Sequence, residues 1–311
     1  MDYHLPIMLD DCVQALNINP TANSPVYVDG TFGGGGHTTA IARACAGFGQ
    51  VIAIDQDSEA IERGHIKNAE RGLDNVTLVH DNFSNISAIL RTLDVSGIDG
   101  ALIDLGVSSH QLDADYRGFS YTKDARLDMR MNNNANLDAH HVVNHYEQDK
   151  LKLIFKRYGE EPFAGLLAKN IVIARERAPI DTTRQLFDLI IDSVPKKLGL
   201  SPVKRVFQAI RIEVNNELGI IEQTIHNMVE ALNPGGRLAI ITFHSLEDRI
   251  VKQTYNELMN PCKCPRDFPH CICGKEPTVK VLTRKPILPT AEEMEQNSRS
   301  KSAKLRILEK L

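Results

Sequence analysis

The stretch VYVDGTFGGGGH, residues 26–37, decides the fold. Its first residues are apolar and partly β-branched, which predicts a buried strand that ends at Gly30. The glycines predict a tight turn, and the residues from Thr38 to Ala46 have a helical pattern. Because a plain turn needs only one or two glycines, four in a row indicate that the backbone approaches a ligand closely.

Strand and helix patterns alternate on the C-terminal side of this turn. The predicted strands are Gln50–Asp55, Asn75–His80 and Ile98–Leu105, and the predicted helices are Ser58–Arg71, capped by Ser58, and Ile86–Leu93. Such alternation predicts an α/β fold with a doubly wound parallel sheet. After Pro234-Gly235-Gly236, residues 237–243 are again apolar and predict a further strand of the same sheet.

The alternation stops between residues 113 and 205, which have helical periodicity and no convincing strand pattern. The predicted helices are Asp149–Tyr158, Phe163–Arg177, Thr182–Val194 and a long stretch, Val203–Leu232, which begins with Ser201 as cap and breaks near Gly219. We therefore predict a discontinuous α/β domain, residues 1–112 and 206–311, with an α-helical insertion, residues 113–205.

Composition and charge exclude several classes of protein. The chain has 311 residues, of which 42% are hydrophobic and 24% charged, and this excludes a disordered or fibrous chain. Because no apolar run reaches the roughly 20 residues that span a bilayer and the N-terminus lacks a secretory signal, we expect a cytoplasmic protein without a membrane partner. Residues 113–211 hold 17 basic and 13 acidic side chains, and residues 275–311 hold 9 and 5. These surpluses favour a nucleic-acid partner, although they also suit an ordinary solvated surface.

Three features follow predicted strands, at the edge where parallel sheets bind ligands. They are the glycine turn, Asp55, whose carboxylate could accept the hydroxyls of a ribose, and Asp104. A dinucleotide and S-adenosylmethionine both suit such a site. The dinucleotide pattern G-x-G-x-x-G fails because Thr38 occupies its last position, and the triphosphate pattern G-x-x-x-x-G-K-[ST] is absent. The turn also holds no Lys or Arg, so the pattern favours S-adenosylmethionine.

Further motifs accompany the glycine turn, and together they resemble one known family. The motifs are DLGVSSHQLD (residues 104–113), RGFS (117–120), LDMRM (127–131), FQAIRI (207–212) with Asn215 and Glu217-Leu218, FHSLEDRIVK (243–252) and RSKSAKLR (299–306). They run nearly from end to end, and the chain resembles the bacterial family of small-subunit rRNA cytosine N4 methyltransferases. His110 departs from the pattern, because the family usually has proline at that position.

The resemblance implies a class I, Rossmann-like methyltransferase fold that uses S-adenosylmethionine. Carried over by position, the implied cofactor contacts are Gly35, Gly36, His37, Asp55, Phe83, Asp104 and Gln111. The residues themselves agree on the glycines, Asp55 and Asp104. The ring of Phe83 at a strand end could stack on adenine, and core packing is the alternative.

The resemblance also implies the reaction. A methyl group passes from S-adenosylmethionine to the exocyclic N4 amine of a decoding-region cytosine, position 1402, of 16S rRNA, in the small ribosomal subunit or a late assembly intermediate. No catalytic metal is expected. Because the lone pair of this amine is delocalised, we expect acceptors for its hydrogens at Asp104, at the Leu105 carbonyl and at Ser108 or Ser109. Asp104 could instead serve the cofactor alone, and the serines could cap a helix.

Aromatic and basic residues in the motifs are the candidates for RNA contacts. Phe119 and Phe243 could stack on a base that leaves its helix, with core packing as the alternative, and His244 could hydrogen-bond it. Candidates for phosphate contacts are Arg117, Arg126, Arg130, Lys301, Lys304 and Arg306.

Four cysteines, Cys262, Cys264, Cys271 and Cys273, could bind a structural Zn²⁺ ion, and free thiols in an exposed loop are the alternative. Cys12 and Cys45 are predicted core residues. Two other functions are weighed against the methyltransferase. An NAD-dependent oxidoreductase conflicts with the failed dinucleotide pattern, and a non-catalytic RNA-binding or assembly protein would have no use for the acidic strand ends.

Overall fold

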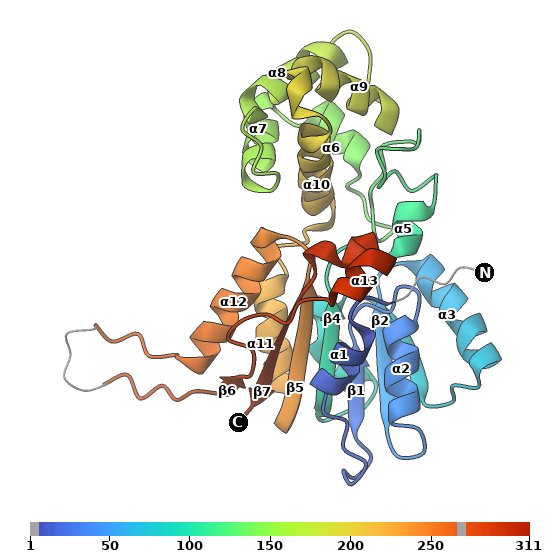
Figure 1. Ribbon diagram of the computed structural model, residues 1–311, viewed down its shortest axis with the longest axis vertical. Coiled ribbons are helices and arrows are strands. Elements are labelled where there is room, and N and C mark those ends of the chain that lie inside the picture. Colours follow the sequence, from blue (N-terminus) through green and yellow to red (C-terminus); the bar gives the residue numbers. More distant parts are fainter. Residues whose placement is uncertain (1–5, 266–271) are drawn as a thin grey trace. The chain divides into compact units, whose positions relative to one another are not determined.

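The computed structural model describes residues 6–265 and 272–311 (Figure 1). The chain divides into two compact units. The first comprises Met1–Gly106 and Gly219–Leu311, and the second comprises Val107–Leu218. The predicted boundaries, 112/113 and 205/206, differ from these and fall inside two helices, α5 (Ser109–Asp113) and α10 (Ser201–Asn215). Helical periodicity alone does not show which unit a helix packs into, and this accounts for the error.

The described part of the first unit contains a seven-stranded sheet in the order β3-β2-β1-β4-β5-β7-β6. Its strands are β1 Val26–Asp29, β2 Gln50–Asp55, β3 Val76–His80, β4 Ile98–Asp104, β5 Leu232–Thr242, β6 Val279–Val281 and β7 Lys304–Lys310. Strands β1 to β5 are parallel, and β7 runs antiparallel to both β5 and β6. The predicted α/β fold with a doubly wound parallel sheet is confirmed, and the sheet order is that of a class I, Rossmann-like fold.

Helices cover both faces of this sheet, as parallel strands require. Neighbouring residues of one strand, such as Leu102 and Ile103, point to opposite faces and are both at most 1% exposed. Figure 1 shows α1 and α2 in front of the sheet and α11 behind it. The helices of this unit are α1 Leu9–Ala15, α2 Gly36–Ala44, α3 Ser58–Arg71, α4 Ile86–Thr92, α11 Ile221–Ala231, α12 Ser245–Met259 and α13 Ala291–Gln296.

The strand register brings three carboxylates to one edge of the sheet. Asp29, the last residue of β1, pairs with Ala53 of β2 and with Leu102 of β4. Asp55 and Asp104 therefore each lie two residues farther along the neighbouring strands. The glycine turn that follows β1 begins between these two strand ends.

Several local expectations for this unit need correction. Helix α2 begins at Gly36, inside the glycine run, and not at Thr38. The side chain of Asp57, and not that of Ser58, caps α3 by accepting the Glu59 amide. The sequence analysis predicts no strand in the basic C-terminal segment, whose residues from Lys304 form β7 and pair with β5.

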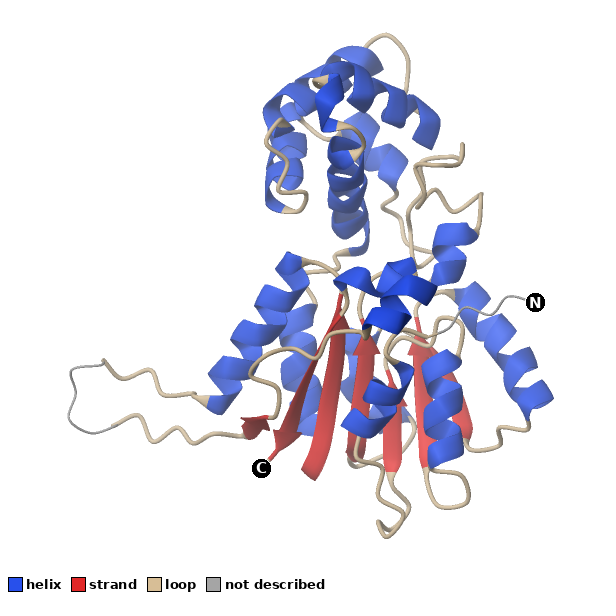
Figure 2. Cartoon of the chain, in the orientation of Figure 1, coloured by secondary structure: helices blue, strands red, loops and turns tan. Residues whose placement is uncertain are grey.

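The described part of the second unit consists of helices joined by loops, with an isolated bridge between Arg126 and Thr182 (Figure 2). Besides α5 and α10 its helices are α6 Ala139–His145, α7 Gln148–Arg157, α8 Ala164–Arg175 and α9 Thr183–Ser193. The helices predicted around α7, α8 and α9 are confirmed. Ser201 is the first helical residue of α10 and not its cap, which is Leu200. The predicted break before α11 occurs at Asn216, which adopts a left-handed conformation with φ 49°.

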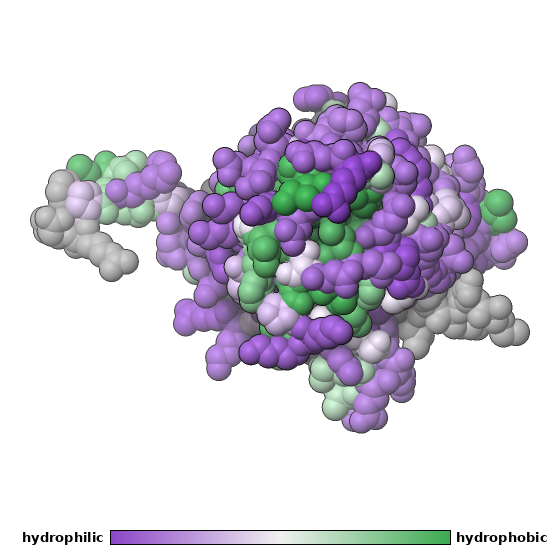
Figure 3. Space-filling view, turned by 90° about the horizontal axis from the view of Figure 1, so that it is seen from above, coloured by the Kyte–Doolittle hydropathy of each residue, from purple (hydrophilic) through white to green (hydrophobic). Residues whose placement is uncertain are grey.

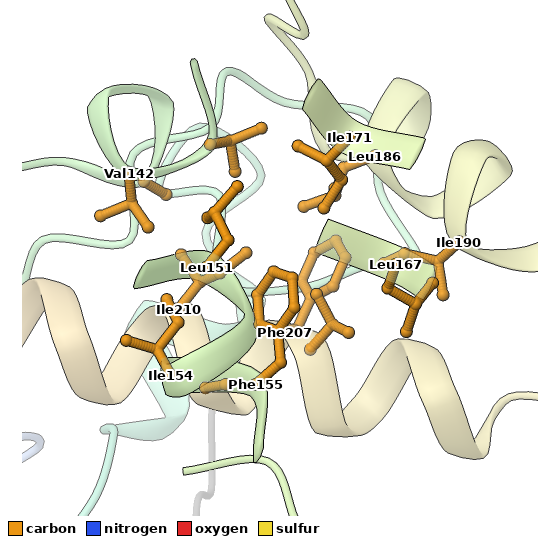
Figure 4. Packing of buried hydrophobic residues seen from close by; sticks show 14 of the residues in the cluster. Val142, Leu151, Ile154, Phe155, Leu167, Ile171, Leu186, Ile190, Phe207 and Ile210 are labelled. Carbon is orange, nitrogen blue, oxygen red and sulfur yellow. The ribbon is translucent and has the colours of Figure 1, made fainter. Parts of the chain in front are cut away.

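The second unit has a hydrophobic core of its own. Helix α10 packs against α6, α7 and α9, and α8 packs against α7. Figure 4 shows the side chains of Leu151, Phe155, Leu167 and Phe207 gathered between these helices. Apolar side chains also reach the surface of this unit, including Leu166 and Ile173 of α8. Figure 3, seen from above Figure 1, shows an apolar area within a hydrophilic rim.

Among the described residues, no helix combines the length and the apolar character that crossing a membrane requires.

Candidate functional site

Backbone hydrogen bonds fix the glycine turn against the neighbouring strand β2. The Gly33 amide donates to Asp55 Oδ2 over 2.7 Å, and the Phe32 amide donates to the Ile54 carbonyl over 2.8 Å. The Gly35 amide closes the turn by donating to the Phe32 carbonyl over 2.7 Å. The end of β2 therefore sets the path of the backbone that follows β1.

The glycines of the turn are not equivalent. Gly35 has φ +76°, and a Cβ there would lie 2.7 Å from the Phe32 ring. A Cβ on Gly36 would lie 2.2 Å from Pro6 Cγ, whereas a Cβ on Gly34 would meet nothing within 4 Å. Gly35 and Gly36 are thus required by the fold itself, and Gly33, with φ +51°, has a conformation that favours glycine. Gly34 leaves open space beside the start of α2.

Asp29 connects the turn to β4, and sequence reasoning gave it no role. Its carboxylate is fully buried, accepts the Thr38 hydroxyl over 2.6 Å and accepts the Thr31 amide over 3.1 Å. The Thr31 hydroxyl in turn accepts the Asp104 amide over 2.7 Å. An Asp followed two residues later by Thr is a sequence signal for such a side-chain-braced turn.

Asp55 is held at the end of β2 by backbone donors. Its Oδ1 accepts the Asp57 amide over 2.9 Å, while its Oδ2 accepts Gly33. Burial raises the pKa of Asp55 to about 6, although these two amides lower it. Each carboxylate oxygen has a second lone pair, so the group can still accept hydroxyl donors.

Asp104 carries the clearest sign of a ligand. Its Oδ1 atom is buried and has no hydrogen-bond partner among the described residues. Its Oδ2 atom lies 3.9 Å from His37 Nδ1. Burial raises the pKa of Asp104 to about 7, with His37 opposing the shift and the negative charges of Asp29 and Glu247 adding to it. A buried acceptor without a donor is costly, so this atom calls for a cation or a hydrogen-bond donor.

His37 and Phe83 both lie at this edge of the sheet. His37 is 6% exposed, and its Nε2 lies 3.0 Å from the Ile7 carbonyl, which places the Nδ1 atom toward Asp104. Phe83 is 9% exposed and packs beside the turn, since a Cβ on Gly30 would lie 3.2 Å from Phe83 Cβ. This packing fits the core alternative for Phe83.

A buried glutamate organises the end of β5. Glu247, 1% exposed, accepts the amides of Phe243 and His244 through its Oε2 over 2.7 and 3.2 Å. The His244 Nδ1 accepts the Glu247 amide over 3.4 Å, and its Nε2 lies 3.1 Å from Glu247 Oε1. The Nδ1 atom of His244 therefore caps α12, whereas its buried Nε2 atom has no hydrogen-bond partner among the described residues. A Glu three residues after the cap was the sequence signal for this arrangement.

Two residues of the predicted site belong to the second unit. Ser109 is the first residue of α5. Gln111 is 4% exposed and completes a capping box with Ser108. The backbone amide of Ser108 donates to Gln111 Oε1 over 3.0 Å, and the backbone amide of Gln111 donates to the Ser108 hydroxyl over 3.2 Å. The helix-cap alternative thus applies to Ser108. The Ser109 hydroxyl takes no part in this capping box.

Several expected RNA contacts are instead structural. Phe119 is 6% exposed in the core of the second unit, so a base cannot stack on it there. Arg117, 3% exposed, donates to the carbonyls of Arg130 and Met131. Arg130 forms a two-pronged ion pair with Asp128 and donates to the Ala135 carbonyl. The burial of Phe119 and the protein partners of Arg117 and Arg130 count against these expected contacts.

The same applies to the basic C-terminal segment. Arg306 is 5% exposed in β7, and its Nε donates to Asp248 Oδ1 over 2.7 Å. Lys304 Nζ lies 3.3 Å from Asp248 Oδ2. Lys301 is exposed.

The described cysteines fall into two groups. Cys12 and Cys45 are fully buried in the core of the first unit, as predicted. The sulfur atoms of Cys262, Cys264 and Cys273 all lie within 4.8 Å of one another. Cys271, the fourth predicted ligand, lies outside the described residues.

The strand-end site suits a positively charged ligand that also carries hydroxyl groups. Two carboxylates, Asp55 and Asp104, flank a turn that holds neither Lys nor Arg. A pyrophosphate would meet repulsion there, whereas a positively charged ligand would lower the cost of burying these carboxylates.

A family model and curated relatives match nearly the whole chain. A family model described as the MraW methylase family matches residues 1–311. A protein named ribosomal RNA small subunit methyltransferase H, from Clostridium botulinum (strain Loch Maree / Type A3), is 51% identical over 310 residues, 99% of either chain. The protein of that name from Brevibacillus brevis is 48% identical over 312 residues, 99% of this chain and 98% of the other. A solved structure described as a putative rRNA-methylase from Clostridium thermocellum covers 99% of both chains at 12% identity, with a TM-score of 0.46.

Proposed function

The chain belongs to the MraW methylase family, and we propose that it transfers a methyl group from S-adenosylmethionine to the exocyclic N4 amine of a decoding-region cytosine of 16S rRNA. The substrate is the small ribosomal subunit or a late assembly intermediate, and the enzyme works in the cytoplasm, where subunits are assembled. Membership in a methylase family sets aside both the oxidoreductase and the non-catalytic RNA-binding alternatives.

The observation that carries this proposal is the buried Oδ1 of Asp104, which has no hydrogen-bond partner among the described residues. S-adenosylmethionine fits the strand-end site, because it brings an ammonium, a sulfonium and ribose hydroxyls to a place with two carboxylates. Asp55 would accept the ribose hydroxyls, and Asp104 would accept the ammonium. Gly34, Gly35 and Gly36 would let the ligand approach the backbone at the start of α2.

When bound, S-adenosylmethionine supplies a methyl group on a positively charged sulfur, which is strongly electrophilic. The nitrogen–methyl bond forms as the sulfur–methyl bond breaks, and the amine must then lose one proton. The ammonium of the cofactor would lower the pKa of Asp104, which burial raises to about 7 in the cofactor-free chain. We therefore propose that Asp104 accepts a hydrogen bond from the amine through its second carboxylate oxygen and that the proton passes to solvent after methyl transfer. The Leu105 carbonyl and the Ser109 hydroxyl are the further acceptors that we propose for the amine.

Residues at the end of β5 complete the proposal. Phe243 is partly exposed, and its amide is fixed by Glu247, so its ring is held in place as a stacking surface for a base. His244 is positioned by the same carboxylate. We propose that Phe243 contacts the cytosine and that His244 and Glu247 position it.

The second unit supplies the RNA-binding surface in this proposal. Helix α7 exposes Lys152 and Lys156, which lie four residues apart and therefore share one face of the helix. Exposed lysines are also present at Lys196, Lys197 and Lys204. Such cations gain affinity by releasing counterions from the RNA backbone.

The test is methyl transfer from labelled S-adenosylmethionine to purified small subunits, large subunits and naked 16S rRNA. We expect incorporation into small subunits or their late precursors, and none into large subunits. The variant Asp104→Ala should incorporate at least a hundredfold less label. Equal labelling of both subunits would contradict the proposed substrate, and full activity of the Asp104 variant would contradict the proposed site.

A further inference from the structure

The loop between α12 and β6 brings three cysteine side chains together, and the methyl-transfer chemistry has no use for them. The sulfur atoms of Cys262, Cys264 and Cys273 lie within 4.8 Å of one another, although eight residues separate Cys264 from Cys273. In a tetrahedral zinc–thiolate site the sulfurs are about 3.8 Å apart, given bonds of about 2.3 Å to the metal. The three sulfurs therefore need to approach by about 1 Å or less.

Two backbone features around the cluster suit thiolate ligands. The Ile272 amide donates to Cys264 Sγ over 3.4 Å, and such a donor stabilises a sulfur that carries negative charge. Gly274, directly after Cys273, has φ +61°, a left-handed turn conformation that glycine adopts without a steric cost. Lys263, between Cys262 and Cys264, and Lys275, two residues after Cys273, would offset the net negative charge of a zinc–thiolate centre.

The loop has little else to hold it in one conformation. Every described residue from 260 to 278 is exposed or half-exposed, and Ile272 is 75% exposed. A segment that buries so little apolar surface is ordered by a cross-link rather than by a core.

We propose that Cys262, Cys264 and Cys273 bind a Zn²⁺ ion as thiolates, releasing one proton each, and that the ion fixes the fold of this loop. Thiolate donors select a soft cation of tetrahedral preference, which describes Zn²⁺. The site is structural and independent of the proposed methyl transfer.

The first experiment is elemental analysis of the full chain, purified from zinc-supplemented cells under reducing conditions and passed over a desalting column. We expect about one zinc ion per chain. The triple variant C262S/C264S/C273S should retain at least tenfold less zinc. The double variant C12A/C45A, which removes cysteines elsewhere in the chain, should retain the full amount. Equal zinc in the wild type and the triple variant, or none in the wild type, would overturn the proposal.

A second measurement does not depend on metal acquired in the cell. Cobalt(II) added to the metal-free chain should give intense near-ultraviolet absorption from thiolate-to-metal charge transfer, together with the visible bands of tetrahedral cobalt. Each single Cys-to-Ser variant should weaken the near-ultraviolet absorption. Absence of these bands would overturn the proposal. So would a thiol titration of the unfolded, zinc-free chain showing that two of these cysteines react only after reduction, because a disulfide would then join them.

Discussion

The Gly33 amide donates to Asp55 Oδ2 over 2.7 Å, and this bond joins the turn after β1 to the end of β2. One carboxylate thus shapes the glycine turn and faces the position proposed for the ribose. Replacing Asp55 should therefore damage cofactor binding in two ways.

We expect Asp55→Ala to weaken S-adenosylmethionine binding about tenfold to a hundredfold, since hydrogen bonds to a charged group contribute about 1.5–3 kcal/mol. Titration calorimetry measures the change. Glu62→Ala, an exposed position on α3, is the control and should bind normally. Unchanged affinity of the Asp55 variant would remove this residue from the site.

The glycine turn predicts a contrast between neighbouring positions. Gly35→Ala must adopt φ +76° and place a Cβ 2.7 Å from the Phe32 ring, so it should cost about 1–3 kcal/mol of stability. Gly34→Ala meets nothing within 4 Å and should change stability by less than about 0.5 kcal/mol. Thermal unfolding without cofactor separates the two, and equal destabilisation would contradict the described turn.

Asp104 predicts a pH dependence of stability. Burial raises its pKa to about 7, so between about pH 4 and pH 7 the folded chain binds more protons than the unfolded chain. This group therefore makes the cofactor-free chain less stable as the pH rises through that window. Asp104→Asn has no carboxyl to titrate at this position, so it lacks this loss of stability with rising pH.

The stability of Asp104→Asn relative to the wild type should increase by at least about 1 kcal/mol between pH 5 and pH 8, a relative gain of roughly 2–4 °C in melting temperature. Asp74→Asn, at an exposed loop position, should show no such trend. A pH-independent difference for the Asp104 variant would show that this carboxyl is not desolvated.

Arg306 separates a structural role from an RNA contact. Its guanidinium pairs with Asp248 in a nearly solvent-free position, so Arg306→Gln leaves a partly buried carboxylate behind and should cost about 2–4 kcal/mol. Lys301→Gln, at an exposed position, should leave the melting temperature unchanged. If Arg306→Gln weakened RNA binding while stability stayed the same, the ion pair would not be its main role.

The exposed lysines of α7 predict the opposite behaviour. Lys152→Glu with Lys156→Glu should weaken binding to small subunits and flatten its dependence on salt concentration, since fewer counterions are released. Stability should stay within about 0.5 kcal/mol of the wild type. Arg91→Glu, exposed on α4 of the first unit, is the charge-reversal control. An unchanged salt dependence would argue that α7 does not face RNA.

Much of the fold could be predicted from sequence because its signals are local. The strands Gln50–Asp55 and Ile98–Asp104 have buried β-branched patterns that end on a carboxylate, and the structure has them within a residue of the prediction. Strand β7 was missed because four of the seven residues in Lys304–Lys310 are charged, and the segment was interpreted as a source of phosphate contacts. Only pairing with β5 shows that Arg306 is buried.

The candidate site could be predicted only as far as its strand-end carboxylates. What distinguishes Asp104 is an unsatisfied buried oxygen and the nearby charge of Glu247, a residue 143 positions away that a different strand end brings close. Phe119 and Arg130 lie in motifs that look functional, yet their partners are the core and Asp128. Motif membership indicates that a residue matters, and only packing shows whether it contacts a ligand.

The most direct test of the account is to identify the methylated nucleoside. Small subunits from cells that lack this chain are incubated with it and S-adenosylmethionine, and nuclease fragments of the 16S rRNA are analysed by mass spectrometry. The account predicts N4-methylcytidine at a single decoding-region cytosine, and its absence with Asp55→Ala and with Asp104→Ala. Methylation of a different atom or a different region, or equal product from the two variants, would contradict it.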